Sequence, residues 1–144
     1  MIKLGVIGFS DGNGHPYSWG AIFNGYNKEA MKECGFPVIP DYLSKRQLPE
    51  ECIKGAEVTH VWTQDVNLSH QIAKAANIKN VCKTIEELGN SVDAILLARD
   101  DWQSHTEIGI PLMKTGKPIY IDKPITVYND ELEELAKAQI FPGQ

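Results

Sequence analysis

The sequence predicts a doubly wound α/β fold, in which a mainly parallel sheet carries helices on both faces. In residues 91–124, two apolar runs, Val92–Ala98 and Ile119–Ile121, flank one amphipathic segment, which is the pattern of a βαβ unit. At the N-terminus, a strand at Lys3–Gly8 enters a glycine-rich loop and then a helical pattern. Polar residues follow each predicted strand, and the carboxyl ends of parallel strands are where open α/β sheets build their sites.

Composition indicates one globular domain over residues 1–144, with 42% hydrophobic and 23% charged residues. The net charge is −5 and no Lys/Arg run exceeds two residues, which argues against nucleic-acid and anionic-membrane partners. No apolar stretch approaches the roughly 20 residues that a membrane helix needs, and the N-terminus begins as a strand rather than a signal peptide. Three widely spaced cysteines indicate reduced thiols and a cytoplasmic protein.

The first half of the chain contains the least regular stretch. A helix is expected over Tyr17–Tyr26, because apolar residues recur there at helical spacing. Residues 28–34 could extend that helix, with Gly35 as its end, and Leu48–Ile53 could form a short helix that begins at Pro49. Since residues 36–40 are too rich in proline for a central strand, residues 27–55 are interpreted as an insertion before the second main strand.

The second half alternates strands and helices. Strands are expected at Glu57–Thr63, Asn80–Cys82, Val92–Ala98 and Lys117–Ile121. Helices are expected at Leu68–Ala76 and from a capping box at Thr84 to about Gly89. A third helix should begin at an Asp100 or Asp101 cap and run to about Lys114, with a kink or break at Pro111. A last helix should follow an Asn129 cap, with Leu132, Leu135 and Ala136 on its core face.

The glycine loop departs from the dinucleotide-binding fingerprint. Counted from Gly8, the pattern G-x-G-x-x-G requires glycine where this chain has Ser10 and Asn13, and its glycines stand instead at positions 12 and 14. A strand, a glycine loop and a helix together present backbone N–H groups to a phosphate. The alternative is a Gly/Asn-rich turn without a ligand.

Other polar residues can be interpreted either as functional or as structural. Lys123 follows a buried strand directly, which favours a functional ammonium over a solvated one. His105 could contact a substrate or pack on its helix, and His15 with the aromatic residues after it could line a substrate pocket or pack at a helix start. Residues Arg99–Asp101 could be a site or a self-satisfied charge cluster. The histidines at positions 60, 70 and 105 lack ligand spacing, so no metal site is expected.

Several of these motifs together resemble one family. Val92–Ala98, His105, the run Gly116–Ile121 and the tripeptide Asp122–Pro124 are similar to the N-terminal NAD(P)-binding Rossmann domain of the Gfo/Idh/MocA oxidoreductases, the relatives of glucose–fructose oxidoreductase and inositol dehydrogenase. Members read V-D-A-V, then a helix with His, then G-K-x-V with E-K-P at the end of the next strand. The resemblance extends from residue 1 to about residue 138.

The resemblance implies NAD or NADP as cofactor and hydride transfer to or from a sugar or cyclitol-like hydroxyl, as in sugar metabolism. It implies that Lys123 approaches the nicotinamide ribose and the substrate hydroxyl, with Asp122 and His105 in the catalytic group. The cofactor-binding residues that it implies lie at the ends of four strands: Gly8, Phe9, Ser10, Gly12, Asn13 and Gly14 at the pyrophosphate, Thr63 and Gln64 at the adenosine ribose, and Ala98, Arg99, Asp100 and Lys123 at the nicotinamide.

Three departures from the family pattern matter. Asp122 replaces the usual glutamate, and Thr63 stands where NAD-preferring members often carry an acidic residue, so the choice between NAD and NADP stays open. The family's second domain, with the rest of the substrate site, has no counterpart in residues 139–144. We therefore expect a piece of a longer enzyme that is weak or inactive alone and could self-associate through exposed apolar surface. The alternative is a non-catalytic nucleotide- or nucleotide-sugar-binding or assembly module.

Overall fold

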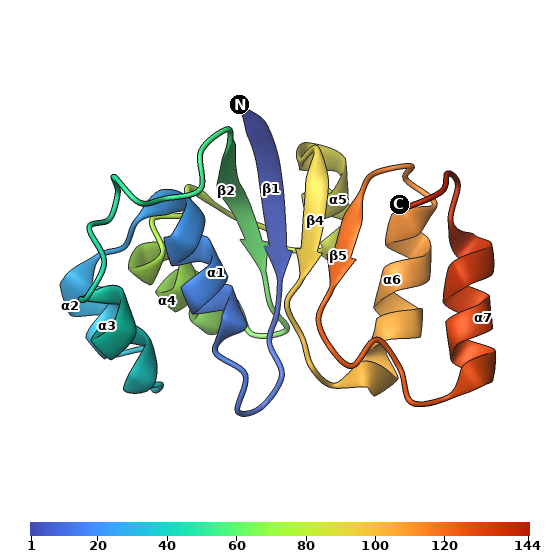
Figure 1. Ribbon diagram of the computed structural model, residues 1–144, viewed down its shortest axis with the longest axis horizontal. Coiled ribbons are helices and arrows are strands. Elements are labelled where there is room, and N and C mark those ends of the chain that lie inside the picture. The colour runs from blue at the N-terminus through green and yellow to red at the C-terminus, as the bar shows by residue number, and fades with distance from the viewer.

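Five strands form one sheet, and every neighbouring pair in it runs parallel (Figure 1). The computed structural model describes residues 1–144. The strand order is β3-β2-β1-β4-β5, so the chain reverses direction across the sheet between β1 and β4. The strands are β1 (Ile2–Ile7), β2 (Ala56–Trp62), β3 (Asn80–Val81), β4 (Ala94–Leu97) and β5 (Ile119–Ile121). The expected α/β class is confirmed, and the sheet is parallel throughout.

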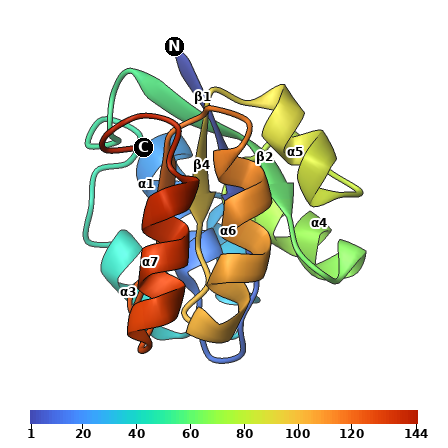
Figure 2. The same cartoon turned by 90° about the vertical axis from the view of Figure 1, so that its right-hand side faces the viewer.

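Helices cover both faces of this sheet (Figures 1 and 2). One face carries α1 (His15–Asn24), α2 (Lys28–Lys32), α3 (Val38–Leu43) and α4 (Val66–Ala75). The other face carries α5 (Ile85–Ser91) and α6 (His105–Met113). The 3₁₀ turn η1 (Trp102–Ser104) and the last helix, α7 (Asn129–Ala138), pack on α6. Figure 2 shows α6 and α7 side by side. This two-sided arrangement is the doubly wound fold that the sequence predicts.

Alternation along β1 divides the core into two clusters. Leu4 and Val6 face the cluster beneath α1 to α4, whereas Ile7 faces the cluster beneath α5 and α6. On β2, Val58 and Val61 face the same cluster although three positions separate them. The reason is a shift of register between β1 and β2, which adds one residue to β2 and switches the face of the residues that follow.

Residues 27–55 form short elements on the face of α1 and α4. The expectation that 28–34 extend the first helix was wrong, because Gly25 leaves helical geometry at φ 73° and Asn27 caps a separate α2 by accepting from the Ala30 N–H at 3.0 Å. α3 was missed, since its first turn follows Pro37. The short helix expected from Pro49 is a series of turns instead.

Helix starts differ from the expectations in two of three cases. The Thr84 cap is confirmed, because its hydroxyl accepts from the Glu87 N–H at 3.1 Å. Asp101 stands at the N-cap position of η1, but neither its carboxylate nor that of Asp100 caps a helix, since these groups bind Arg99 and Ser10. Asn129 is the first residue within α7 rather than its cap. α6 continues through Pro111 without a break in the helix.

α7 buries less apolar surface than its pattern predicts. Leu135 is buried against the rest of the protein, but Leu132 is 44% exposed and Ala136 is exposed too. The reason is that α7 packs on α6 at the outside of the fold, so only one narrow stripe of the helix meets a neighbour. No helix of the protein is both long enough and apolar enough to span a membrane. All three cysteines are buried and unpaired.

Candidate cofactor and catalytic site

The carboxyl ends of four strands meet at one edge of the sheet (Figure 1, lower side). The backbone N–H of the first residue after a strand donates to the backbone carbonyl of the last residue of the neighbouring strand. Gly8 donates its N–H to the Trp62 carbonyl at 3.0 Å, Ala98 to Ile7 at 2.8 Å, and Asp122 to Leu97 at 3.0 Å. The loops after β1, β2, β4 and β5 therefore begin at the same level, which places the predicted site residues around one edge.

The glycine loop, residues 8–14, leaves backbone donors free. The N–H groups of Asp11, Gly12 and Gly14 donate no hydrogen bond within the chain, and Gly12 has φ 76° with no atom within 4 Å of where a Cβ would stand. α1 begins directly after the loop without a side-chain cap or an acidic residue in its first turn. The positive end of this helix and the free N–H groups suit an anionic group such as a cofactor pyrophosphate.

Two glycines of the loop are required by close packing. A Cβ on Gly8 would lie 2.6 Å from Cγ of Pro16, and one on Gly14 would lie 2.5 Å from Cδ1 of Ile39. Gly8 thus lets the strand end approach the first turn of α1, which is a role that glycines have in dinucleotide-binding loops. Gly14 lets α3, from the stretch 27–55, pack against the loop.

Asp122 is the first residue after β5, an outermost strand of the sheet, and its side chain is only 1% exposed. Its Oδ1 accepts from the Lys123 N–H at 2.8 Å, and its Oδ2 accepts from Asn13 Nδ2 at 3.1 Å. His15 Nδ1 also contacts Oδ2, in a short hydrogen bond. All three partners are N–H groups, so the buried carboxylate is fully paired and joins the glycine loop to the end of β5.

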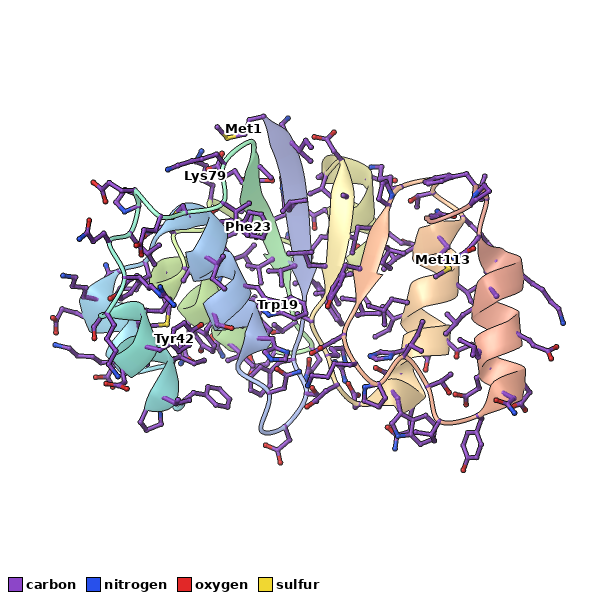
Figure 3. All side chains as sticks on the ribbon, viewed as in Figure 1. Met1, Trp19, Phe23, Tyr42, Lys79 and Met113 are labelled. Carbon is purple, nitrogen blue, oxygen red and sulfur yellow. The ribbon has the colours of Figure 1, made fainter.

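The sequence left open whether His15 lines a pocket or packs at a helix start, and the structure places it beside a pocket and in contact with Asp122. Its ring stacks on Trp19, with ring centroids 4.8 Å apart and an angle of 12° between the ring planes. Trp19 and Tyr120 in turn form a T-shaped pair with ring centroids 5.5 Å apart. Figure 3 shows Trp19 projecting from α1. The sequence signal was the run Asn-Gly-His-Pro at a helix start, but its partner Asp122 lies 107 residues away.

A pocket of about 400 Å³ opens beside His15, between α1 and α3. Trp19, Phe36 and Ile39 give it apolar walls, while Ser18 and Tyr42 supply hydroxyl groups. Tyr42 comes from α3 (Figure 3). Burial raises the pKa of the Tyr42 phenol, which therefore stays a neutral donor. The stretch 27–55 thus provides one wall of a cavity next to the glycine loop.

The end of β2 is arranged differently from the expectation. Thr63 is 4% exposed, and its hydroxyl donates to the Asp65 carbonyl at 2.6 Å instead of facing the edge. Gln64 pairs with the Phe9 backbone through both amide atoms, at 2.7 and 2.9 Å. Arg99 donates to Gln64 Oε1 at 3.2 Å, so an arginine from another strand reaches this position.

The segment after β4 is held by its own charged residues. Arg99 forms a bidentate ion pair with Asp101, with hydrogen bonds of 2.6 and 2.9 Å. Asp100 accepts from the Ser10 hydroxyl at 2.6 Å. Burial raises the pKa of Asp101, but the hydrogen bonds and charge of Arg99 outweigh it and leave that pKa below its usual value. The bonds between Ser10 and Asp100 connect the glycine loop to the segment that follows β4 and begins at the buried Ala98.

His105 is fully buried, and both of its ring nitrogens contact backbone carbonyls. Nδ1 lies 2.8 Å from the Ile125 oxygen and Nε2 lies 2.8 Å from the Arg99 oxygen. No nitrogen of this ring is free to meet a substrate. The ring instead connects the segment after β4 to the segment that follows Lys123.

Lys123 is exposed, and its ammonium group makes no hydrogen bond within the chain. The Lys123 backbone N–H donates to the Asp122 carboxylate, and the carbonyl of Ile125, two residues later, contacts the His105 ring. The ammonium is therefore anchored at its base and free at its tip. No three His, Cys, Asp or Glu side chains are grouped so that they could hold a metal ion.

Structural comparison finds dehydrogenases of the same fold. They include a UDP-N-acetylglucosamine 3-dehydrogenase from Acidithiobacillus ferrooxidans, with 15% identity, a TM-score of 0.61, and coverage of 95% of this chain and 34% of that one. A scyllo-inositol dehydrogenase from Lactobacillus casei with bound NAD(H) and scyllo-inositol has 15% identity, a TM-score of 0.62, and coverage of 96% and 32%. A mutant 3-ketoreductase from Actinomadura kijaniata, in complex with TDP-benzene and NADP, has 18% identity, a TM-score of 0.59, and coverage of 95% and 33%.

The chain spans about a third of the length of these solved proteins. No curated protein sequence matches it. The family model for the oxidoreductase family with an NAD-binding Rossmann fold, Gfo/Idh/MocA, matches residues 2–140. The motifs, the all-parallel sheet and this match agree, and the chain belongs to that family.

Proposed function

We propose that this chain is the cofactor-binding part of a cytoplasmic oxidoreductase that moves hydride between NAD(P) and a sugar or cyclitol-like hydroxyl. One observation carries the proposal: the free N–H groups of the glycine loop and the free ammonium of Lys123 are brought to one sheet edge by a shared partner, Asp122. When bound, the nicotinamide supplies the hydride chemistry. The chain's own residues bind it, orient it and hold the reacting oxygen.

Each loop has a part in this proposal. The glycine loop, residues 8–14, holds the pyrophosphate through its N–H groups and the start of α1. Gln64 and Arg99 lie toward the adenosine ribose, and Ala98 with Asp100 toward the nicotinamide. Lys123 holds the substrate oxygen, and its positive charge stabilises the negative charge that develops there. His105 positions both segments, in place of the catalytic role expected for it.

Fluorescence titration with NADH tests the proposal. NADH should bind saturably, and Lys123→Ala should raise its Kd about three- to tenfold, because an anchored ammonium at the nicotinamide ribose is lost. Lys137→Ala, in the last turn of α7, removes an exposed lysine paired with Glu133 and should leave the Kd unchanged. A folded wild-type chain that binds neither NADH nor NADPH would contradict the function.

The pair of glycine variants Gly8→Ala and Gly109→Ala tests the loop. Gly8→Ala forces the loop away from Pro16 and should raise the NADH Kd about tenfold, by displacing the N–H groups from the phosphates. A Cβ on Gly109 would meet its nearest atoms at 3.6 Å, an ordinary contact, so this variant should bind as the wild type does. Equal affinities for both variants would place the cofactor elsewhere.

The rival function is a nucleotide- or nucleotide-sugar-binding module without redox chemistry. It is favoured by Thr63, whose hydroxyl bonds within its own turn and is not offered to a cofactor ribose. UDP-N-acetylglucosamine added to the same titration separates the two. Displacement of NADH by NADPH but not by the nucleotide sugar supports the oxidoreductase, whereas saturable binding of the nucleotide sugar alone supports the module.

A further inference from the structure

We propose that the pocket between α1 and α3 binds a neutral sugar ring of the substrate, next to the ring that reacts. The inference rests on the proposed hydride-transfer function and deepens it, because it narrows the substrate to a glycoside with at least two rings. The ring that exchanges hydride with the nicotinamide lies at the sheet edge, and the second ring fills the pocket beside it.

The pocket is already formed in the protein without a ligand. Its outer wall comes from α3, which lies beside α1 (Figure 1). Ile39 and Leu43 anchor α3 in the core, and a Cβ on Gly14 would lie only 3.0 Å from the Phe36 ring. The volume of about 400 Å³ falls within the roughly 300–1,000 Å³ of small-molecule sites. Binding therefore does not require the stretch 27–55 to rearrange.

The charge of the pocket favours a neutral ligand. The residues that line it include no Lys, Arg, Asp or Glu, although 23% of the residues of the chain are charged. His15, the only lining side chain that can become positive, already pairs with Asp122. A phosphate, carboxylate or ammonium group would lose water here without gaining a side chain of opposite charge. An uncharged molecule does not incur that cost.

The pocket combines aromatic surface with polar atoms, which suits a sugar ring. Trp19 and Phe36 provide aromatic walls, and Tyr42 provides a phenol from the opposite helix (Figure 3). Trp19 Nε1 and His15 Nε2 have no hydrogen-bond partner within the chain, and neither atom is buried. A pyranose ring presents C–H groups on its faces and hydroxyl groups around its rim. Such a ring can stack on the aromatic walls while its hydroxyls bond to these unpaired atoms.

The pocket adjoins the proposed reaction site without including it. Gly12 and Gly14 belong both to the pocket and to the glycine loop. His15 lines the pocket and contacts Asp122, whose carboxylate also accepts from the Lys123 N–H. Lys123 itself does not line the pocket. A ring in the pocket therefore lies next to the cofactor loop but apart from the ammonium that holds the reacting oxygen, as a part of the substrate that does not react would.

Saturation-transfer NMR on the chain loaded with NADH tests the inference. Cellobiose, maltose and lactose are the two-ring probes, and glucose and myo-inositol are the one-ring probes. At least one disaccharide should bind about threefold or more tighter than either one-ring probe, because only a two-ring molecule contacts the pocket and the sheet edge together. Val38→Trp, at a pocket position that is 68% exposed, fills the pocket and should abolish this advantage. Leu132→Trp, 44% exposed on α7, should leave all the sugar affinities unchanged.

The outcomes separate this inference from the proposed function. Disaccharides that bind no tighter than glucose, or that bind Val38→Trp as they bind the wild type, overturn the second-ring site. A chain that binds NADH but none of the sugars also overturns it, and leaves the proposed function intact. A folded chain that does not bind NADH or NADPH overturns both.

Discussion

Asp122→Ala should lower the free energy of unfolding by about 3 kcal/mol, because it removes the common acceptor of three N–H groups. The side chain is 1% exposed, so water does not replace it freely. Asn13, His15 and the Lys123 N–H would each lose a partner at once. The loss should therefore exceed that of an ordinary surface substitution several-fold.

Urea unfolding followed by tryptophan fluorescence measures this loss. Asp41→Ala is the matched control, since Asp41 accepts from the Lys45 ammonium but is 63% exposed on α3. That variant should change stability by less than about 0.5 kcal/mol. If Asp122→Ala unfolded at the same urea concentration as Asp41→Ala, Asp122 would not be the connection between the glycine loop and β5.

The sheet could be predicted because its signal is local. β1, β2 and β4 are short apolar runs followed by polar residues, and each can be recognised from its own residues without knowledge of the rest of the chain. Parallel strands then place their carboxyl ends together by topology, so the approximate site followed without any contact being known. The predicted edge residues Ser10, Asp100 and Gln64 indeed bind across that edge.

The contacts within the site could not be predicted, because they join distant parts of the chain. Ser10 and Asp100 lie 90 residues apart, and Asn13 and Asp122 lie 109 apart. The direction of Thr63 depends on the turn formed with Ser69, which no periodic pattern reveals. Local rules also failed in 27–55, where the six residues of α3 are too few to show a helical period.

His105→Leu should cost about 3 kcal/mol of unfolding free energy, since it removes the ring nitrogens that contact two backbone carbonyl groups in a fully buried place. Leucine keeps most of the volume and removes only the polar contacts. His70→Leu, at an exposed position on α4, should change stability by less than about 0.5 kcal/mol. Urea unfolding of both variants gives the comparison.

The same variant separates positioning from catalysis. If His105 positions the segment of Lys123 through the Ile125 carbonyl, His105→Leu should weaken NADH binding, and Lys123→Ala should then cost less than it does in the wild type. A double-mutant cycle on the NADH Kd, run at urea-free conditions where all four proteins are folded, measures this coupling. Additive effects would mean that the two residues act independently, and an unchanged Kd in His105→Leu would mean that the fully buried ring serves stability alone.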